Sequence, residues 1–65
     1  MKLRFRFFYQ QLGTHTHVRL FAAPAHNGTV GTYALVGVLR YRNDEWAAFR
    51  EDAVRTSFEF VKEEV

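Results

Sequence analysis

The first strand-like segment alternates between two kinds of surface. Within KLRFRFFYQ (residues 2–10) every second side chain is apolar, and the positions between carry Lys2, Arg4 and Arg6. Strict alternation over this length is typical of a strand with one face in a core. Phe8 is the one apolar side chain among the cations. The pattern predicts a strand whose second face is more apolar than a purely solvated surface.

The next segment predicts a hairpin followed by a long connection. After Gly13, which can adopt the positive φ of a turn, residues 15–22 alternate again and predict a second strand paired with the first. The connection AAPAHNGTVGT contains Pro24, which has no N–H for a ladder, so we expect central pairing to stop there. Asn27-Gly28 is a strong signal for a type I′ turn. The connection is either a functional loop or a hairpin that extends past the sheet, and we favour the hairpin.

Residues 32–42 predict a third strand that is apolar on both faces in its middle. We therefore expect this strand to lie in the centre of the sheet. Gly37 either leaves room for a ring from the helix or marks a β-bulge. Alternation would place Tyr33, Leu35, Leu39 and Tyr41 on one face and Ala34, Val36, Val38, Arg40 and Arg42 on the other.

The apolar period changes to that of a helix at residues 44–55. Asn43 and Asp44 are side chains that cap a helix N-terminus. SFEFVK (residues 57–62) then alternates again and predicts a short fourth strand. The apolar stripe of the helix, at spacings of three and four, consists of Trp46, Ala47, Phe49, Ala53 and Val54.

The expected fold is α+β, as a single domain over residues 1–65. An antiparallel four-stranded sheet in β-β-β-α-β order would carry one helix on one face, as a two-layer sandwich. A core in a chain of 65 residues typically yields about 3–5 kcal/mol of net stability. Without cysteine, further stability must come from aromatic packing or self-association. The expected core beneath the helix consists of Leu3, Phe5, Phe7, Val18, Leu20, Leu35, Leu39, Phe58 and Phe60.

One helix would leave the other face of the sheet uncovered. An apolar centre with an arginine rim is typical of protein interfaces, so a protein partner or a second copy in a homodimer is the favoured occupant. Single-stranded nucleic acid is an alternative, with arginines on phosphates and rings stacked on bases. An ordinary surface, where arginine stems cover aliphatic side chains, is another. The candidate binding residues are Arg4, Arg6, Phe8, Arg19, Phe21, Val36, Val38 and Arg40.

Charge is distributed unevenly along the chain. Residues 1–42 contain six Lys and Arg and no Asp or Glu, whereas residues 43–65 contain three Lys and Arg and seven Asp and Glu. This asymmetry indicates either an acidic or polyanionic partner or self-complementary association. The acidic last third disfavours nucleic acid. No apolar run approaches about 18 residues and no signal peptide is visible, so we expect a cytoplasmic protein without membrane contact.

Motifs for catalysis and metal binding are sparse. His15 and His17 lie on one side of a strand and would hold Zn²⁺ only with a third ligand, for which His26 and Glu59 are the candidates. We expect neither a metal nor another cofactor. Ser57 is the only serine and no histidine lies near it in sequence to act as its base. The chain is therefore expected to have no enzymatic activity.

Two strings between His17 and Arg50, HVRLFAAP and GTYALVGVLRYRNDEWAAFR, resemble sequences of small orphan proteins encoded by phages of actinobacteria. The resemblance implies a short accessory protein that binds and modulates a host or phage component in the host cytoplasm, and it identifies no functional residue. Together these observations favour a protein-interaction module that uses its uncovered sheet face. A module for single-stranded nucleic acid and a purely self-associating structural subunit are the alternatives.

Overall fold

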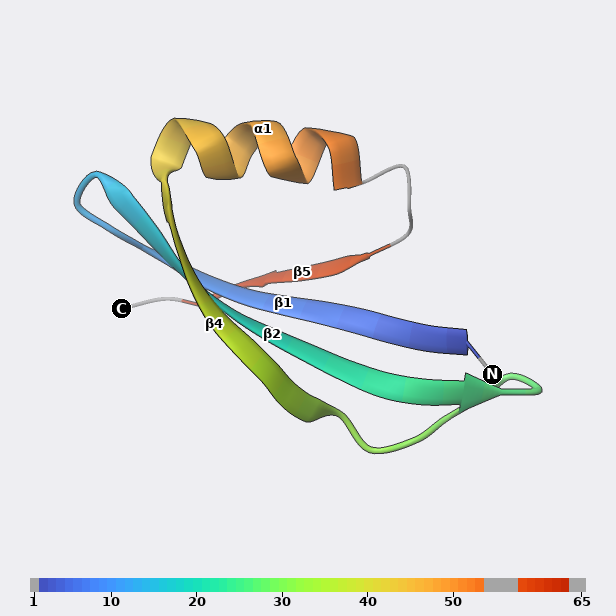
Figure 1. The fold of residues 1–65 in the computed structure, drawn as a ribbon. Helices are drawn as coiled ribbons and strands as arrows, with labels where there is room; N and C mark the ends of the chain where they lie inside the picture. Colours follow the sequence, from blue (N-terminus) through green and yellow to red (C-terminus); the bar gives the residue numbers. More distant parts are fainter. Residues whose placement is uncertain (1, 54–57, 64–65) are drawn as a thin grey trace.

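The computed structural model describes residues 2–53 and 58–63. In these residues the chain forms five strands and one helix (Figure 1). The hairpin predicted at the start is present, and both of its strands are longer than predicted. The elements are β1 (Lys2–Leu12), β2 (His15–His26), β3 (Thr29–Val30), β4 (Ala34–Arg42), α1 (Asn43–Ala53) and β5 (Glu59–Lys62).

β5 lies parallel to β1, and this makes the sheet mixed. β4 ends beside the β1–β2 turn, where the backbone N–H of Asn43 donates to the carbonyl oxygen of Thr14 at 3.0 Å. α1 then runs back over the sheet, so β5 starts beside the middle of β1, where Glu59 lies opposite Arg6, and follows the direction of β1 (Figure 1). The α+β fold with one helix on one face is confirmed. The prediction of four antiparallel strands is wrong, because the sheet has five strands and one parallel pair.

β2 continues past its predicted end at residue 22 and through Pro24. Pro24 lies opposite Leu3 of β1, and its carbonyl oxygen accepts from the backbone N–H of Gly31 at 2.8 Å. Because the amide N and the carbonyl of a strand residue point to the same side, the missing N–H faces β3 and the β1–β2 ladder loses no bond. The prediction that pairing stops at Pro24 is therefore wrong. Asn27 and Gly28, with φ of 51° and 80°, form the expected tight turn of an extended hairpin.

A β-bulge interrupts β4 beside Gly37. Leu20 of β2 lies opposite Gly37, but the next residue, Phe21, lies opposite Leu35. β4 therefore contains one extra residue, Val36, at this point. No atom lies within 4 Å of the position that a Cβ would take at Gly37. Of the two predicted roles of this glycine, the bulge is confirmed and the space for a helix ring is not.

β4 is an edge strand, so its predicted central position is wrong. Among the strands of the described residues it pairs only with β2, while β1 and β2 occupy the centre. The extra residue reverses the alternation in the first part of β4, so that Leu35 shares a face with Val38 and not with Leu39. Tyr33 also changes face, and its ring lies against the guanidinium of Arg6 on the side of the sheet opposite α1. The apolar character that predicted a central strand is instead exposed at an edge.

The core forms where α1 covers the sheet. Trp46 is 1 % exposed and packs against Phe7, Tyr9 and Val18 of the two central strands. The Trp46 ring centroid lies 5.2 Å from that of Tyr9 and 6.2 Å from that of Phe7. This dense packing of rings is the main source of stability that the sequence offers in place of a disulfide. Partly buried side chains around it are Phe5, Leu20, Tyr41, Phe49, Phe58 and Phe60.

Three predicted core residues are exposed, for two reasons. Leu3 is 55 % exposed because α1 spans only the end of the sheet near the β1–β2 turn, and Leu3 lies at the other end (Figure 1). Leu35 and Leu39 are exposed because they lie on the edge strand. Ala47, assigned to the helix stripe, is also exposed. Val54 and Ser57 lie outside the described residues.

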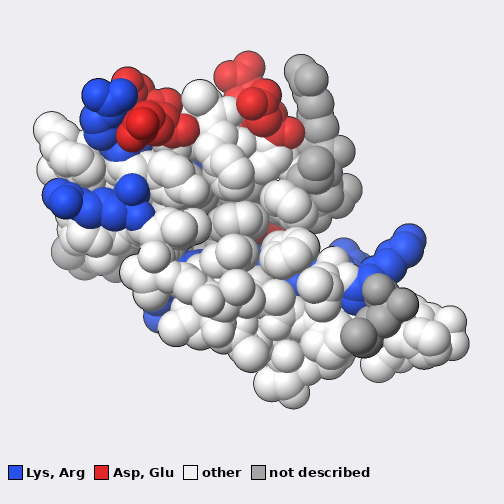
Figure 2. Space-filling model, in the orientation of Figure 1, with Lys and Arg blue, Asp and Glu red and all other residues white. Residues whose placement is uncertain are grey.

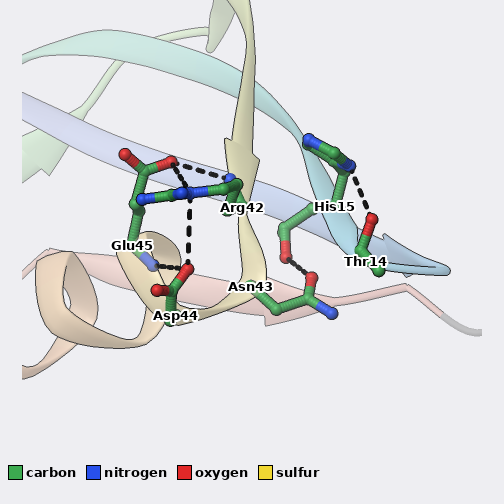
Figure 3. Close-up of polar contacts among 7 residues, drawn as sticks. Thr14, His15, Arg42, Asn43, Asp44 and Glu45 are labelled. Carbon is green, nitrogen blue, oxygen red and sulfur yellow. Dashed lines mark hydrogen bonds and ion pairs between the residues drawn. The ribbon is translucent and has the colours of Figure 1, made fainter.

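The start of α1 is fixed by side chains on both sides of it. Glu45 Oε1 accepts from the backbone N–H of Arg42 at 3.0 Å, as in one half of a capping box (Figure 3). Asp44 Oδ1 accepts from the backbone N–H of Glu45. Asn43 does not cap the helix as predicted: its Oδ1 accepts from the Thr16 hydroxyl at 2.8 Å and its Nδ2 donates to a turn carbonyl. Asn43 therefore joins the helix to the β1–β2 hairpin.

Candidate interaction surface

The sheet face opposite α1, called the open face below, carries an aromatic pair at its centre. The rings of Phe8 on β1 and Phe21 on β2 meet edge to face, with centroids 5.3 Å apart. The guanidinium of Arg19 lies 5.6 Å from the Phe8 centroid and 5.8 Å from that of Phe21. Such contacts hold a cation over ring faces. The structure thus brings together three of the predicted binding residues.

Arg6 is held by two neighbours on the same face. Its Nε donates to Glu59 Oε2 of β5 at 2.8 Å, and its guanidinium lies 4.1 Å from the centroid of the Tyr33 ring. The hydrogen bond to Glu59 raises the pKa of Arg6 above its ordinary value. Sequence reasoning missed Tyr33 here, because simple alternation placed it on the face beneath the helix.

The acidic last third of the chain neutralises part of the basic first part. Arg19 Nη2 donates to both carboxylate oxygens of Glu63 at 2.7 Å, and Arg6 pairs with Glu59. Arg42 lies 3.7 Å from Asp44 Oδ1. The charge asymmetry that suggested an acidic or polyanionic partner is therefore partly satisfied within the fold. Two of the four arginines proposed for phosphates already have carboxylate partners.

Arg4 and Arg40 lie apart from this centre. Arg4 is at the far end of β1, where it lines a hollow together with Leu3, Phe5 and Phe58. Arg40 lies on the edge strand opposite His17. Within residues 2–53 and 58–63, neither arginine forms an ion pair. The eight predicted residues therefore divide into a central cluster, one residue at the far end, and three on β4.

The β4 segment carries the largest run of exposed apolar side chains. Leu35 is 54 % exposed, Val36 62 %, Val38 67 % and Leu39 38 %. Figure 2 shows a largely uncharged surface across the middle of this view, where β4 passes in front of the sheet. Val38 lies opposite Arg19 of β2, so this strip adjoins the aromatic centre of the open face. Exposed strips of this kind mark interaction sites more often than ordinary surface.

The backbone of β4 is also available for pairing. The carbonyl oxygen of Thr14 accepts from the N–H of Asn43, which directly follows β4. The backbone groups of Thr14 therefore point to the side of β2 on which β4 lies. Alternate residues follow this direction, which places the N–H and C=O groups of Leu39 toward β2 and those of Val38 and Arg40 toward the free edge. The N–H of Arg42, which faces the same way, bonds instead to Glu45. The free edge thus offers the backbone groups of two consecutive outward residues.

The three histidines considered as candidate zinc ligands do not come together. His15 and His17 lie at the turn end of β2, and His26 lies at the other end of the same strand. The Thr14 hydroxyl lies 2.9 Å from Nδ1 of His15, within hydrogen-bond distance. Among the described residues there is no group of three His, Cys, Asp or Glu side chains with the spacing of a metal site.

Comparison of the chain with family models, curated proteins and solved structures gives no match. In the part of the chain that the structure describes, no helix has the length and apolar character needed to cross a membrane.

Proposed function

We propose that this chain is a non-enzymatic protein-interaction module. Its binding surface combines the open face, with Arg6, Phe8, Arg19 and Phe21, and the adjoining free edge of β4. This combined area is called the interaction surface below. The observation that carries the proposal is the run of large exposed apolar side chains on β4, because contiguous exposed apolar patches mark interaction sites.

The apolar strip and the ordered arginines have different roles in this proposal. The exposed leucine and valine side chains of β4 supply apolar area to bury against a partner. Arg6 and Arg19 are held in place by ring and carboxylate contacts, so they need little further ordering to orient a partner. The resemblance to small phage proteins supports a role as an accessory protein that modulates a host or phage protein in the host cytoplasm.

Single-stranded nucleic acid is the alternative ligand for the same face, since Phe8 and Phe21 could stack on bases. The ion pairs of Arg6 and Arg19 weigh against it, because phosphates would have to displace Glu59 and Glu63. Affinity for a nucleic acid would fall steeply with salt concentration. Affinity for an apolar protein surface would change little.

The experiment is affinity capture with the tagged chain from cell lysate, with and without nuclease. It compares wild type with Leu35→Lys, which places a charge in the apolar strip, and with Ala48→Glu on the exposed surface of α1 as the control. We expect a discrete protein to be retained by wild type and Ala48→Glu after nuclease treatment and lost with Leu35→Lys. Loss of the captured material on nuclease treatment would favour the nucleic-acid alternative. Equal capture by all three chains would contradict the proposed surface.

A further inference from the structure

We propose that the free edge of β4 pairs with β4 of a second copy of this chain, antiparallel, so that two sheets join into one. This inference rests on the proposed function and names the occupant of one part of the interaction surface. An antiparallel pair of identical strands has a two-fold axis perpendicular to the sheet. Both helices would therefore lie on the same face of the joined sheet, and both open faces on the other.

The backbone directions select the register. Val38 and Arg40 both point their N–H and C=O groups to the free edge, and Leu39 between them points to β2. With the two-fold axis at Leu39, Val38 of each copy faces Arg40 of the other, and each of these two pairs exchanges two hydrogen bonds. All outward backbone groups of these two residues are then satisfied. A shift by one residue would place an outward residue against an inward one and mismatch the two faces.

The side chains agree with this register. Leu39, half exposed on the helix side of the edge, would meet Leu39 of the second copy in the closely spaced type of antiparallel pair. On the open face, the exposed Val38 would lie against the aliphatic stem of Arg40 of the second copy. Gly37 would lie opposite Tyr41 of the second copy, and the space beside Gly37 is empty of protein atoms. The pairing therefore covers the most exposed valine of the strip.

The fold also indicates which edge of a second copy pairs with β4. Pairing of β4 with β4 closes on itself, whereas pairing of β4 with β5 of another copy would continue into an open filament. β5 is only four residues long and carries Glu59 and Lys62, which protects its edge against pairing. The end of β4 that carries Arg42 does not meet the same end of the second copy, because Arg42 of one copy lies near Val36 of the other. A contact between two short strands is smaller than the about 1,600 Å² of a standard interface, so we expect a dissociation constant on the order of micromolar.

The test uses charge exchange across the proposed pair. Val38→Lys would place an ammonium opposite Arg40 of the second copy, and like charges directly opposite destabilise a strand pair. Adding Arg40→Glu to the same chain would restore opposite charges at both symmetric positions. Val61→Lys on β5, a valine that is 39 % exposed at the other edge, is the matched control.

The measurement is sedimentation equilibrium of the full chain from about 0.1 μM to about 1 mM, a range that brackets micromolar affinity. We expect dimers for wild type and Val61→Lys, roughly 2- to 30-fold weaker association for Val38→Lys, and recovery for V38K/R40E. Circular dichroism checks that each variant is folded. A wild type that stays monomeric throughout overturns the proposal, as does a Val38→Lys chain that dimerises like wild type.

Failure here is distinguishable from failure of the proposed function. A monomeric wild type that still captures a protein, with capture lost in Leu35→Lys, would mean that an extended segment of another protein adds to β4 by strand addition. Self-pairing would then be wrong and the interaction module would stand. A monomeric wild type that captures nothing would overturn both.

Discussion

The two edge strands β4 and β5 differ in length and in exposed apolar area. β5 has four residues, bears Glu59 and Lys62, and uses Glu59 in an ion pair across the open face. β4 has nine residues and four large exposed apolar side chains, and its two charged residues, Arg40 and Arg42, lie toward its end. Short and charged edges discourage pairing, and long apolar edges favour it. The β5 edge is thus protected against strand pairing, and the β4 edge is available to a partner.

The largest effect on stability is expected from a proline substitution on β4. Two prolines at adjacent positions test which backbone N–H groups face β2 and which face the free edge. The N–H of Leu39 faces β2, whereas that of Val38 faces the free edge. Leu39→Pro removes a ladder bond to β2 and should lower the free energy of unfolding by a large part of the stability of so small a domain. Val38→Pro removes no ladder bond, so we expect a folded chain that has lost self-association. Urea unfolding and sedimentation of the two variants measure this. Equal destabilisation by the two prolines would show that the assigned directions are wrong.

A smaller effect is expected at the bulge. Gly37 has no neighbour within 4 Å of a Cβ position and does not have a positive φ. Gly37→Ala should therefore raise the free energy of unfolding of the monomer by about 0.4–1 kcal/mol, because it restricts the unfolded chain. Thermal unfolding of the dilute protein checks this. A loss of stability would mean that the bulge requires glycine.

The ion pair between Arg6 of β1 and Glu59 of β5 should contribute less to the free energy of unfolding. Glu59→Gln removes the carboxylate that pairs with Arg6 on the partly exposed open face. Exposed pairs of this kind change stability little, so we expect a shift in the urea midpoint close to the limit of detection. The hydrogen bond that Arg6 donates to Glu59 raises the pKa of Arg6, so the contribution of Arg6 to stability is present below the ordinary arginine pKa and is lost only above the raised one. Arg6 should thus add no pH dependence at neutral pH, and unfolding curves of wild type and Glu59→Gln should keep the same separation from about pH 6 to 9.

The smallest effect is expected on β5 itself. Val61→Lys replaces a half-exposed side chain on an edge that we regard as protected against strand pairing. Surface changes of this type usually alter stability by no more than about 0.5 kcal/mol. Unfolding and sedimentation should both match wild type. A loss of association with Val61→Lys would indicate that partners use the β5 edge or the adjoining open face instead of β4.

Local patterns in the sequence predicted the elements better than their arrangement. The alternation of residues 2–10 correctly placed Phe7 in the core and Phe8 on the open face, because side-chain direction in a regular strand depends only on parity. The helix, its burial of Trp46 and the Asn27-Gly28 turn depend equally on local signals. The parities of the two strands also placed Phe8 and Phe21 on the same face, and the structure adds the contact between their rings.

The predictions are wrong where the face of a side chain or the direction of a strand depends on distant parts of the chain. The extra residue at Val36 reversed the faces of Leu35 and Tyr33, and a pattern of single residues does not reveal where a bulge lies. The parallel direction of β5 depends on how far α1 runs back across the sheet. The apolar faces of β4 are equally typical of a central strand and of an edge that binds a partner, so the edge became visible only once the neighbours were known.

Amide hydrogen exchange at Val38 and Arg40, measured at low and high protein concentration, tests the difference between the two edges most directly. In dilute solution we expect both amides to exchange rapidly and the Leu39 amide between them to be protected by β2. At high concentration Val38 and Arg40 should become protected, while exchange across β5 (residues 59–62) stays unchanged. Rapid exchange of Val38 and Arg40 at every concentration, or protection that appears on β5 instead, would contradict the account.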